Sequence, residues 1–279
     1  MKKKLLIVFL IFSQLSFASL TECIEAGKGF GSQREIPIEI PKKCKTLLMS
    51  DDTSIVYAKS RDNLVEVYGK KNLLFIRIFK IDKNKYVLDK EHFISGENSK
   101  LSKIIGIKIN TKDGRVYVMN ENHGQKSILS YFYNVGGNLS PARKLITDDL
   151  RDATGFEIDP VGERLYVYSF EKSWVKSFHK DSDPDGRRPA NSSHVLQVFD
   201  ADKSLLKSPI DIKIYNEKLF VLDSDRLLIF KNDLTPISTI LSDGADFQNA
   251  VELSIDENKK SLTIRMKNKS EIFYDISML

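Results

Sequence analysis

One pattern recurs along this chain and limits the folds it can adopt. A short apolar strand is followed by a polar turn, a second strand rich in Val, Leu and Tyr, and a third strand. The second strands of the four clearest copies align on one apolar position: Val116, Leu165, Leu219 and Leu262. A weaker first copy covers residues 54–68. No segment offers a sustained apolar stripe at helical spacing, so we expect an all-β protein.

The repeat has a period of roughly 43 to 54 residues, which is typical of β-propeller blades. We therefore expect a β-propeller with five blades, or with six if the N-terminal region adds one. The last copy ends just after its third strand. Residues 34–40, in which Ile36, Ile38 and Ile40 alternate with other residues, are the natural donor of its fourth strand. Such a strand would close the ring and remove exposed sheet edges.

The first 18 residues have the pattern of a secretory signal peptide. Three lysines at positions 2–4 precede an apolar run over residues 5–12, and Ser16 and Ala18 supply the small residues that signal peptidase reads. The run is too short for a membrane span, which needs about 20 residues, and no later segment comes close. We expect export to the periplasm or to the outside of the cell, with propeller repeats over residues 54–279.

Two cysteines, Cys23 and Cys44, lie in the segment 19–53 between the signal peptide and the repeats. An oxidising compartment favours a disulfide between them. In the chain-entropy model, closing a loop of about 20 residues stabilises the folded state by about 3 kcal/mol. The alternative is a pair of inert, buried thiols.

The charge pattern excludes one class of partner. Without the three signal-peptide lysines the formal net charge falls from +5 to +2, and the remaining charges of both signs are interspersed. A nucleic-acid-binding protein usually carries a concentrated basic face. We therefore expect no nucleic-acid partner.

Two segments resemble secreted bacterial propellers of the NHL, YVTN and gluconolactonase-like type. They are the stretch from Ile158-Asp159-Pro160 through Leu165-Tyr166-Val167, and residues 195–200, which read V-L-Q-V-F-D. The resemblance covers most of the chain after Ser54 and implies the propeller fold. Its motifs are structural, so it implies little about function.

A possible ion site follows the third copy. Asp181, Asp183 and Asp185 occupy alternate positions before Gly186, as in the first part of a calcium-binding loop. The pattern then departs from such loops, because Arg187 and Arg188 follow at once and could neutralise the carboxylates. Calcium binding and a plain acidic turn both remain open.

The same acidic turn belongs to an unusually long predicted loop over residues 170–193. Long loops on rigid scaffolds often carry function. This one contains aromatic and basic residues of the kind enriched in binding hot spots: Trp174, Phe178, His179, Arg187 and Arg188. The alternative is that Trp174 and Phe178 pack the loop against its own blade.

Charged residues also occupy equivalent places on the first strand of each copy: Lys108, Glu157, Lys213 and Glu252. Gluconolactonase-like enzymes hold a divalent metal at the central channel with acidic and amide side chains. Because two of the four positions are lysine, we expect neutralising ion pairs. If a metal were bound there, Glu157, Asp211 and Glu252 would be its candidate ligands.

No motif for nucleophilic catalysis is present, and the four histidines are scattered. The leading hypothesis is a non-enzymatic propeller that binds a protein, peptide or glycan through one face and the 170–193 loop. The alternative is a metal-dependent, lactonase-like hydrolase with its site at the central channel.

Overall fold

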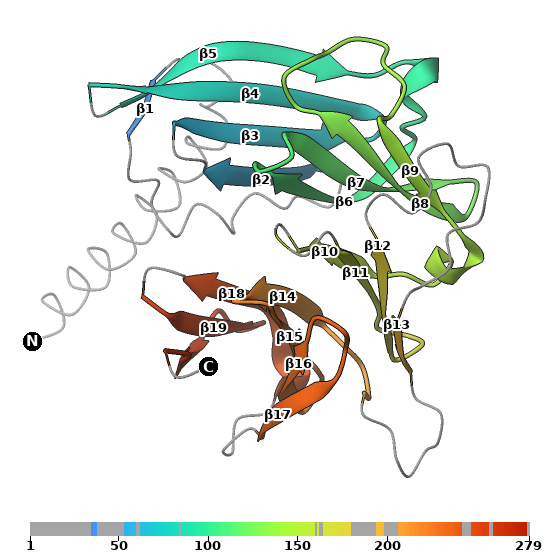
Figure 1. Ribbon diagram of the computed structural model, residues 1–279, viewed down its shortest axis with the longest axis vertical. Helices are drawn as coiled ribbons and strands as arrows, with labels where there is room; N and C mark the ends of the chain where they lie inside the picture. Colours follow the sequence, from blue (N-terminus) through green and yellow to red (C-terminus); the bar gives the residue numbers. More distant parts are fainter. Residues whose placement is uncertain are drawn as a thin grey trace, which may run out of the picture. The chain divides into compact units, whose positions relative to one another are not determined.

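The computed structural model describes residues 35–37, 53–59, 62–83, 85–159, 161, 164–179, 194–197, 206–241, 247–256 and 259–277. Over these residues the chain is built from strands arranged in five antiparallel sheets, with only short 3₁₀ turns as helical structure (Figure 1). No helix within the described ranges is long and apolar enough to cross a membrane. The all-β class and the five repeating sheets predicted from the sequence are confirmed.

The described residues form two compact units. The first unit contains one sheet and residues 132–139, and the second contains the other four sheets. The sheet of the first unit has the order β1-β5-β4-β3-β2. Its strands are β1 (Glu35–Pro37), β2 (Thr53–Lys59), β3 (Asn63–Lys70), β4 (Leu73–Asp82) and β5 (Lys85–Ile94).

The position of β1 corrects the predicted ring closure. Residues 35–37 pair with β5 of the first sheet, with Ile36 opposite Tyr86, and not with the last sheet (Figure 1). The open edge of β5 lies about 50 residues along the chain from β1, whereas the last sheet lies roughly 230 residues away. Closing the shorter loop costs about 1 kcal/mol less conformational entropy. Pro37 suits this place, because an outermost strand can lack an N–H.

In the second unit the chain forms consecutive sheets of four, four, four and three strands. The first is β6 (Lys103–Asn110), β7 (Arg115–Asn122), β8 (Gln125–Phe132) and β9 (Arg143–Ile146). The second is β10 (Gly155–Ile158), β11 (Arg164–Ser169), β12 (Trp174–His179) and β13 (His194–Gln197). The third is β14 (Asp211–Tyr215), β15 (Lys218–Leu222), β16 (Arg226–Lys231) and β17 (Pro236–Leu241). The last is β18 (Ala250–Asp256), β19 (Ser261–Met266) and β20 (Glu271–Asp275).

Alternating side chains bury both faces of the middle strands. On β11, Leu165 and Val167 pack into a core shared with the preceding sheet, whereas Tyr166 and Tyr168 pack into a core shared with the following sheet. Because both faces are covered, the strand is apolar or aromatic at every position from 165 to 168. The first strands β6, β10, β14 and β18 lie next to one another in this order.

The last sheet buries apolar side chains on one of its faces. Leu262 and Ile264 of β19 pack against the third sheet, while Ser261, Thr263 and Arg265 alternate with them on the other face.

A strand lies inside the predicted long loop. β12 occupies residues 174–179 and pairs with β11 along its whole length, with Val175 opposite Tyr168. Residues 195–197, at the start of the segment that resembles a propeller motif, therefore belong to β13, the fourth strand of this sheet. The connection that remains, residues 180–193, lies outside the described residues.

Candidate functional site

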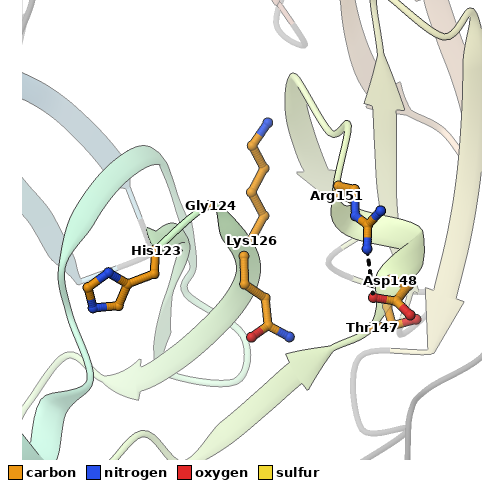
Figure 2. Close-up of a pocket in the computed structure, with 7 residues that line it drawn as sticks. His123, Gly124, Lys126, Thr147, Asp148 and Arg151 are labelled. Carbon is orange, nitrogen blue, oxygen red and sulfur yellow. Dashed lines mark ion pairs between the residues drawn. The ribbon is translucent and has the colours of Figure 1, made fainter.

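A pocket of about 310 Å³ opens in the second unit, between the β7–β8 turn and the segment that joins β9 to β10. Figure 2 shows the turn on one side and the joining segment on the other. The residues that line it are polar or charged, with one glycine: His123, Gly124, Gln125, Lys126, Thr147, Asp148 and Arg151.

Local backbone chemistry builds the first wall. His123 and Gly124 form a two-residue hairpin turn in which both φ angles are positive, 48° and 79°. Such a turn matches the twist of the flanking strands, and glycine adopts its second position without strain. The turn places the exposed His123 at the pocket edge.

The second wall is a short 3₁₀ turn, Asp148–Leu150, that follows β9. Thr147 caps it, because its Oγ1 accepts a hydrogen bond from Asp149 N at 3.3 Å. The Thr147 hydroxyl can therefore still donate its own proton into the pocket. Arg151 lies 3.7 Å from Asp148, and both side chains are mostly exposed, so this ion pair is weak (Figure 2).

Lys126 connects the two walls. Its Nζ donates a hydrogen bond to Ala153 O at 2.5 Å, which holds the ammonium beside the pocket and leaves two further N–H groups. The lining thus carries two cations, Lys126 and Arg151, and an exposed histidine against the single carboxylate of Asp148. This balance favours a ligand with an acidic group, such as a carboxylate.

The predicted charges on the first strands meet in a half-buried cluster. Lys108 Nζ lies 2.8 Å from Glu157 Oε2, so β6 and β10 are joined by an ion pair. Lys213 Nζ of β14 lies 3.5 Å from the same oxygen and 3.2 Å from Asp211 Oδ2. These contacts confirm the expected neutralising pairs.

Backbone N–H groups also donate hydrogen bonds to the carboxylates of Glu157 and Asp211. Glu157 Oε1 accepts from Ile158 N at 3.1 Å, and Asp211 Oδ2 accepts from Leu253 N of β18 at 3.0 Å. Burial alone would raise the pKa of Glu157, but the nearby ammonium groups of Lys108 and Lys213 outweigh it and lower that pKa. Burial would lower the pKa of Lys213, but the two carboxylates raise it.

This cluster does not suit the divalent metal of the lactonase alternative. Glu157 and Asp211 already bind lysines and backbone N–H groups, and Glu252 turns to Arg265 on β19, with 2.5 Å between Oε2 and Nη2. A metal would have to displace these cations from the acids it needs. Within the described ranges, no three His, Cys, Asp or Glu side chains gather closely enough to hold a metal ion.

Two of the predicted binding residues belong to the core. Trp174 is 3% exposed and Phe178 is fully buried, and both pack in the core between the first two sheets of the second unit. Both side chains are buried because β12 is a central strand of its sheet. For this pair the alternative prediction, packing against the blade, is correct, and the predicted contact with a partner is wrong. His179 is exposed at the end of β12.

The other predicted residues fall outside the described part of the chain. They are the calcium ligands Asp181, Asp183 and Asp185, the arginines Arg187 and Arg188, and the cysteines Cys23 and Cys44. Their roles remain sequence predictions, as does the signal peptide.

The backbone of an exposed aromatic residue is bonded to the chain segment that follows Arg151 of the pocket. Phe170, in the turn between β11 and β12, is 47% exposed, and its backbone N donates to Thr154 Oγ1 at 2.9 Å. Thr154 directly follows Ala153, the acceptor of Lys126. His179 lies at the opposite end of β12, about 17 Å away. Phe170 and His179, which both belong to the predicted 170–193 loop, therefore lie at opposite ends of β12.

Sequence reasoning did not find the pocket. Its only local signal is the His-Gly pair between two strands, which predicts a hairpin turn and says nothing of a ligand. The basic residues Lys126 and Arg151 are 25 positions apart and meet only through sheet pairing.

Comparison with known proteins defines the fold class. No protein-family model matches the sequence, and no curated protein matches it. Among solved structures, a functionally unknown protein from Desulfotomaculum acetoxidans is similar, with a TM-score of 0.52, 12% identity and coverage of 80% of this chain and 68% of that one. The β-propeller domain of Cps50 (Swd1) from Myceliophteria thermophila gives the same four values.

A proposed 6-phosphogluconolactonase from Bacteroides uniformis is also similar, with 13% identity and coverage of 79% of this chain and 66% of that one. Its TM-score of 0.49 carries no argument about activity. The likeness at this level of identity shows fold alone. The chain thus has the β-propeller fold, and its five sheets correspond to the blades.

Proposed function

We propose that this protein is an exported, non-enzymatic β-propeller that binds a protein, peptide or glycan partner. In this proposal the pocket receives an acidic group of the partner, and Phe170 supplies an apolar contact beside it. Lys126, Arg151 and the Thr147 hydroxyl are the donors for that group. An exposed aromatic next to charged donors is a common composition for a binding surface.

One observation carries the preference for binding over hydrolysis. The carboxylates that a gluconolactonase-like site would need, Glu157 and Asp211, are neutralised by Lys108 and Lys213. An enzyme of that kind needs several acids that converge on an open position, whereas a binder can keep them paired.

The proposal also includes export of the protein and calcium binding, and both are supported only by sequence patterns. Residues 1–18 have the pattern of a cleaved signal peptide, and Asp181, Asp183 and Asp185 have the alternate spacing of a calcium loop. Mass spectrometry of the protein purified from its exported fraction should show a chain that begins at Ser19.

The pocket is tested with small carboxylates in thermal unfolding experiments on the full chain. The probes are glucuronate, as an acidic sugar, and N-acetylglutamate amide, as an acidic side chain, each beside its uncharged counterpart, glucose or N-acetylglutamine amide. A bound ligand raises the unfolding midpoint by mass action. We expect at least one carboxylate, but not its counterpart, to raise the midpoint of the wild type.

The double variant Lys126→Gln with Arg151→Gln should abolish the shift. Lys112→Gln is the matched control, because Lys112 is an exposed lysine on a different turn of the same sheet. A shift that survives the double variant would reject the pocket. Opening of a simple lactone by the protein, lost in Glu157→Gln, would replace the binding proposal with the hydrolase.

A further inference from the structure

Among the described residues, the last sheet has one strand fewer than the other sheets of the second unit. In the other three sheets of the second unit, the third strand is covered by a fourth: β9, β13 or β17. In the last sheet β20 is the outermost strand among the described residues. An open edge of this kind offers backbone groups for pairing with another extended chain.

Hydrogen bonds at both ends of β20 fix which residues face the open edge. Ile276 N donates to Lys260 O at 2.8 Å, and Met266 N donates to Ser270 O at 2.9 Å. In an antiparallel pair, hydrogen-bonded positions alternate with positions whose N–H and C=O point the other way.

By this alternation, the backbone N–H and C=O groups of Ile272 and Tyr274 point toward β19 and bond with it. The intervening residues, Glu271, Phe273 and Asp275, therefore direct their N–H and C=O groups away from β19 and toward the open edge. These are the groups that an added strand would pair with.

The same three residues share one face of the sheet. Phe273 is 65% exposed, more than any other large apolar side chain among the described residues. Glu271 and Asp275 flank it two positions away on either side, and both are exposed. On the neighbouring strand, the nearest basic side chain on this face, Arg265, is already paired with Glu252.

We propose that an extended peptide adds to β20 as the fourth strand of the last sheet. Its backbone pairs with residues 271–275, an apolar side chain lies beside Phe273, and Lys or Arg at the positions two residues to either side faces Glu271 and Asp275. Cross-strand pairs of opposite charge and apolar pairs each stabilise such an addition.

The charges disfavour a second copy of this chain as the occupant. Antiparallel self-pairing centred on Phe273 would place Glu271 opposite Asp275 of the other copy, and parallel pairing would also bring acids together. Like charges directly opposite each other destabilise a strand pair.

The test measures the binding of a labelled nine-residue peptide to the full chain by fluorescence anisotropy. The peptide carries Lys, Val and Lys at alternate central positions with Thr between them. Replacing both Lys by Glu should weaken binding at least tenfold. N-methylation of the central backbone amides, which removes ladder donors and keeps the side chains, should also weaken it at least tenfold. Equal affinity for the methylated peptide would overturn strand addition.

The variant Phe273→Thr should weaken binding at least fivefold, because it removes the apolar contact while keeping a good strand former. Ile237→Thr on β17 is the matched control, since Ile237 is also an exposed strand residue, at 41%. Absence of binding, or equal effects of the two variants, would overturn the proposal. A dimer in sedimentation that Phe273→Thr dissociates would also overturn it in favour of self-pairing. These probes do not use the pocket, so failure here and failure of the carboxylate test are distinguishable.

Discussion

Lys213 Nζ lies 3.5 Å from Glu157 Oε2, across the boundary between two consecutive sheets. The lysine stands on β14 and the glutamate on β10, so the ion pair joins two sheets that also share an apolar core. Lys108 reaches the same carboxylate oxygen from β6. One glutamate therefore links three sheets, and its removal should affect all of them.

The first prediction is that Glu157→Gln destabilises the protein by about 2–4 kcal/mol, because it leaves two half-buried ammonium groups without their shared anion. Urea unfolding measures the change. Glu121→Gln is the control, since its partner Lys103 is 72% exposed and such surface pairs contribute about 1 kcal/mol or less. Equal losses in the two variants would contradict a structural role for the cluster.

The second prediction concerns pH. The pKa of Glu157 in the folded protein is lowered from 4.5, because Lys108 and Lys213 outweigh the effect of burial. A lowered folded pKa adds stability that is fully present above pH 4.5 and is lost as the pH falls through the folded-state pKa. Urea midpoints measured between about pH 2.5 and 6 should fall more steeply for the wild type than for Glu157→Gln. Parallel curves would show that this carboxyl does not contribute.

The third prediction compares two glycines on neighbouring first strands. A Cβ at Gly155 would lie 2.7 Å from the side chain of Tyr168, whereas a Cβ at Gly106 would lie 3.6 Å from Phe156, an ordinary contact. Gly155→Ala must move a packed tyrosine and should cost about 1–3 kcal/mol. Gly106→Ala should change stability by less than about 1 kcal/mol. Thermal unfolding of both variants checks the difference, and a reversed order would contradict the packing around Tyr168.

The fourth prediction uses the only tryptophan of the chain. Trp174 is 3% exposed and its ring lies 4.6 Å from Lys176 Nζ. Its fluorescence should be blue-shifted and resist iodide quenching in the folded protein, and both properties should be lost on unfolding. Strong quenching in the native state would show that Trp174 faces solvent, as a partner-binding role would require.

The fifth prediction tests the acidic turn at Asp181, Asp183 and Asp185. If these carboxylates bind calcium, adding the ion after treatment with a chelator should raise the unfolding midpoint. Asp183→Ala should remove the shift, and Glu157→Gln should leave it in place. An unchanged midpoint in the wild type would leave a plain acidic turn.

Much of the fold could be predicted from strand periodicity. Alternation places Leu165 and Val167 on one face and Tyr166 and Tyr168 on the other, so apolar residues at every position of a strand require cover on both sides. The equivalent positions of Lys108, Glu157 and Lys213 on successive first strands likewise placed them near one another. A repeat of fixed length brings equivalent residues together, so the ion pairs followed from the pattern.

The binding residues could not be predicted in the same way. Trp174 has the composition of a hot spot, but its pairing with β11 makes it part of the core. Residues 170–179 contain polar and charged side chains, so the sequence predicted one long loop there. The strand β12 within these residues was not predicted.

The sequence by itself determined the fold class of this protein, an all-β repeat. Side chains alternate along each strand with a period of two, and the strand pattern recurs five times. This alternation specifies sheets that are covered by other sheets. Only the tertiary structure decided which edges are paired. β1 joins β5, and the last sheet keeps three strands within the described residues. It also decided that Lys126 and Arg151 meet at one pocket. The physical reason is that side-chain alternation is a local property of the backbone, whereas pairing between distant strands depends on loop closure and on the competition among open edges.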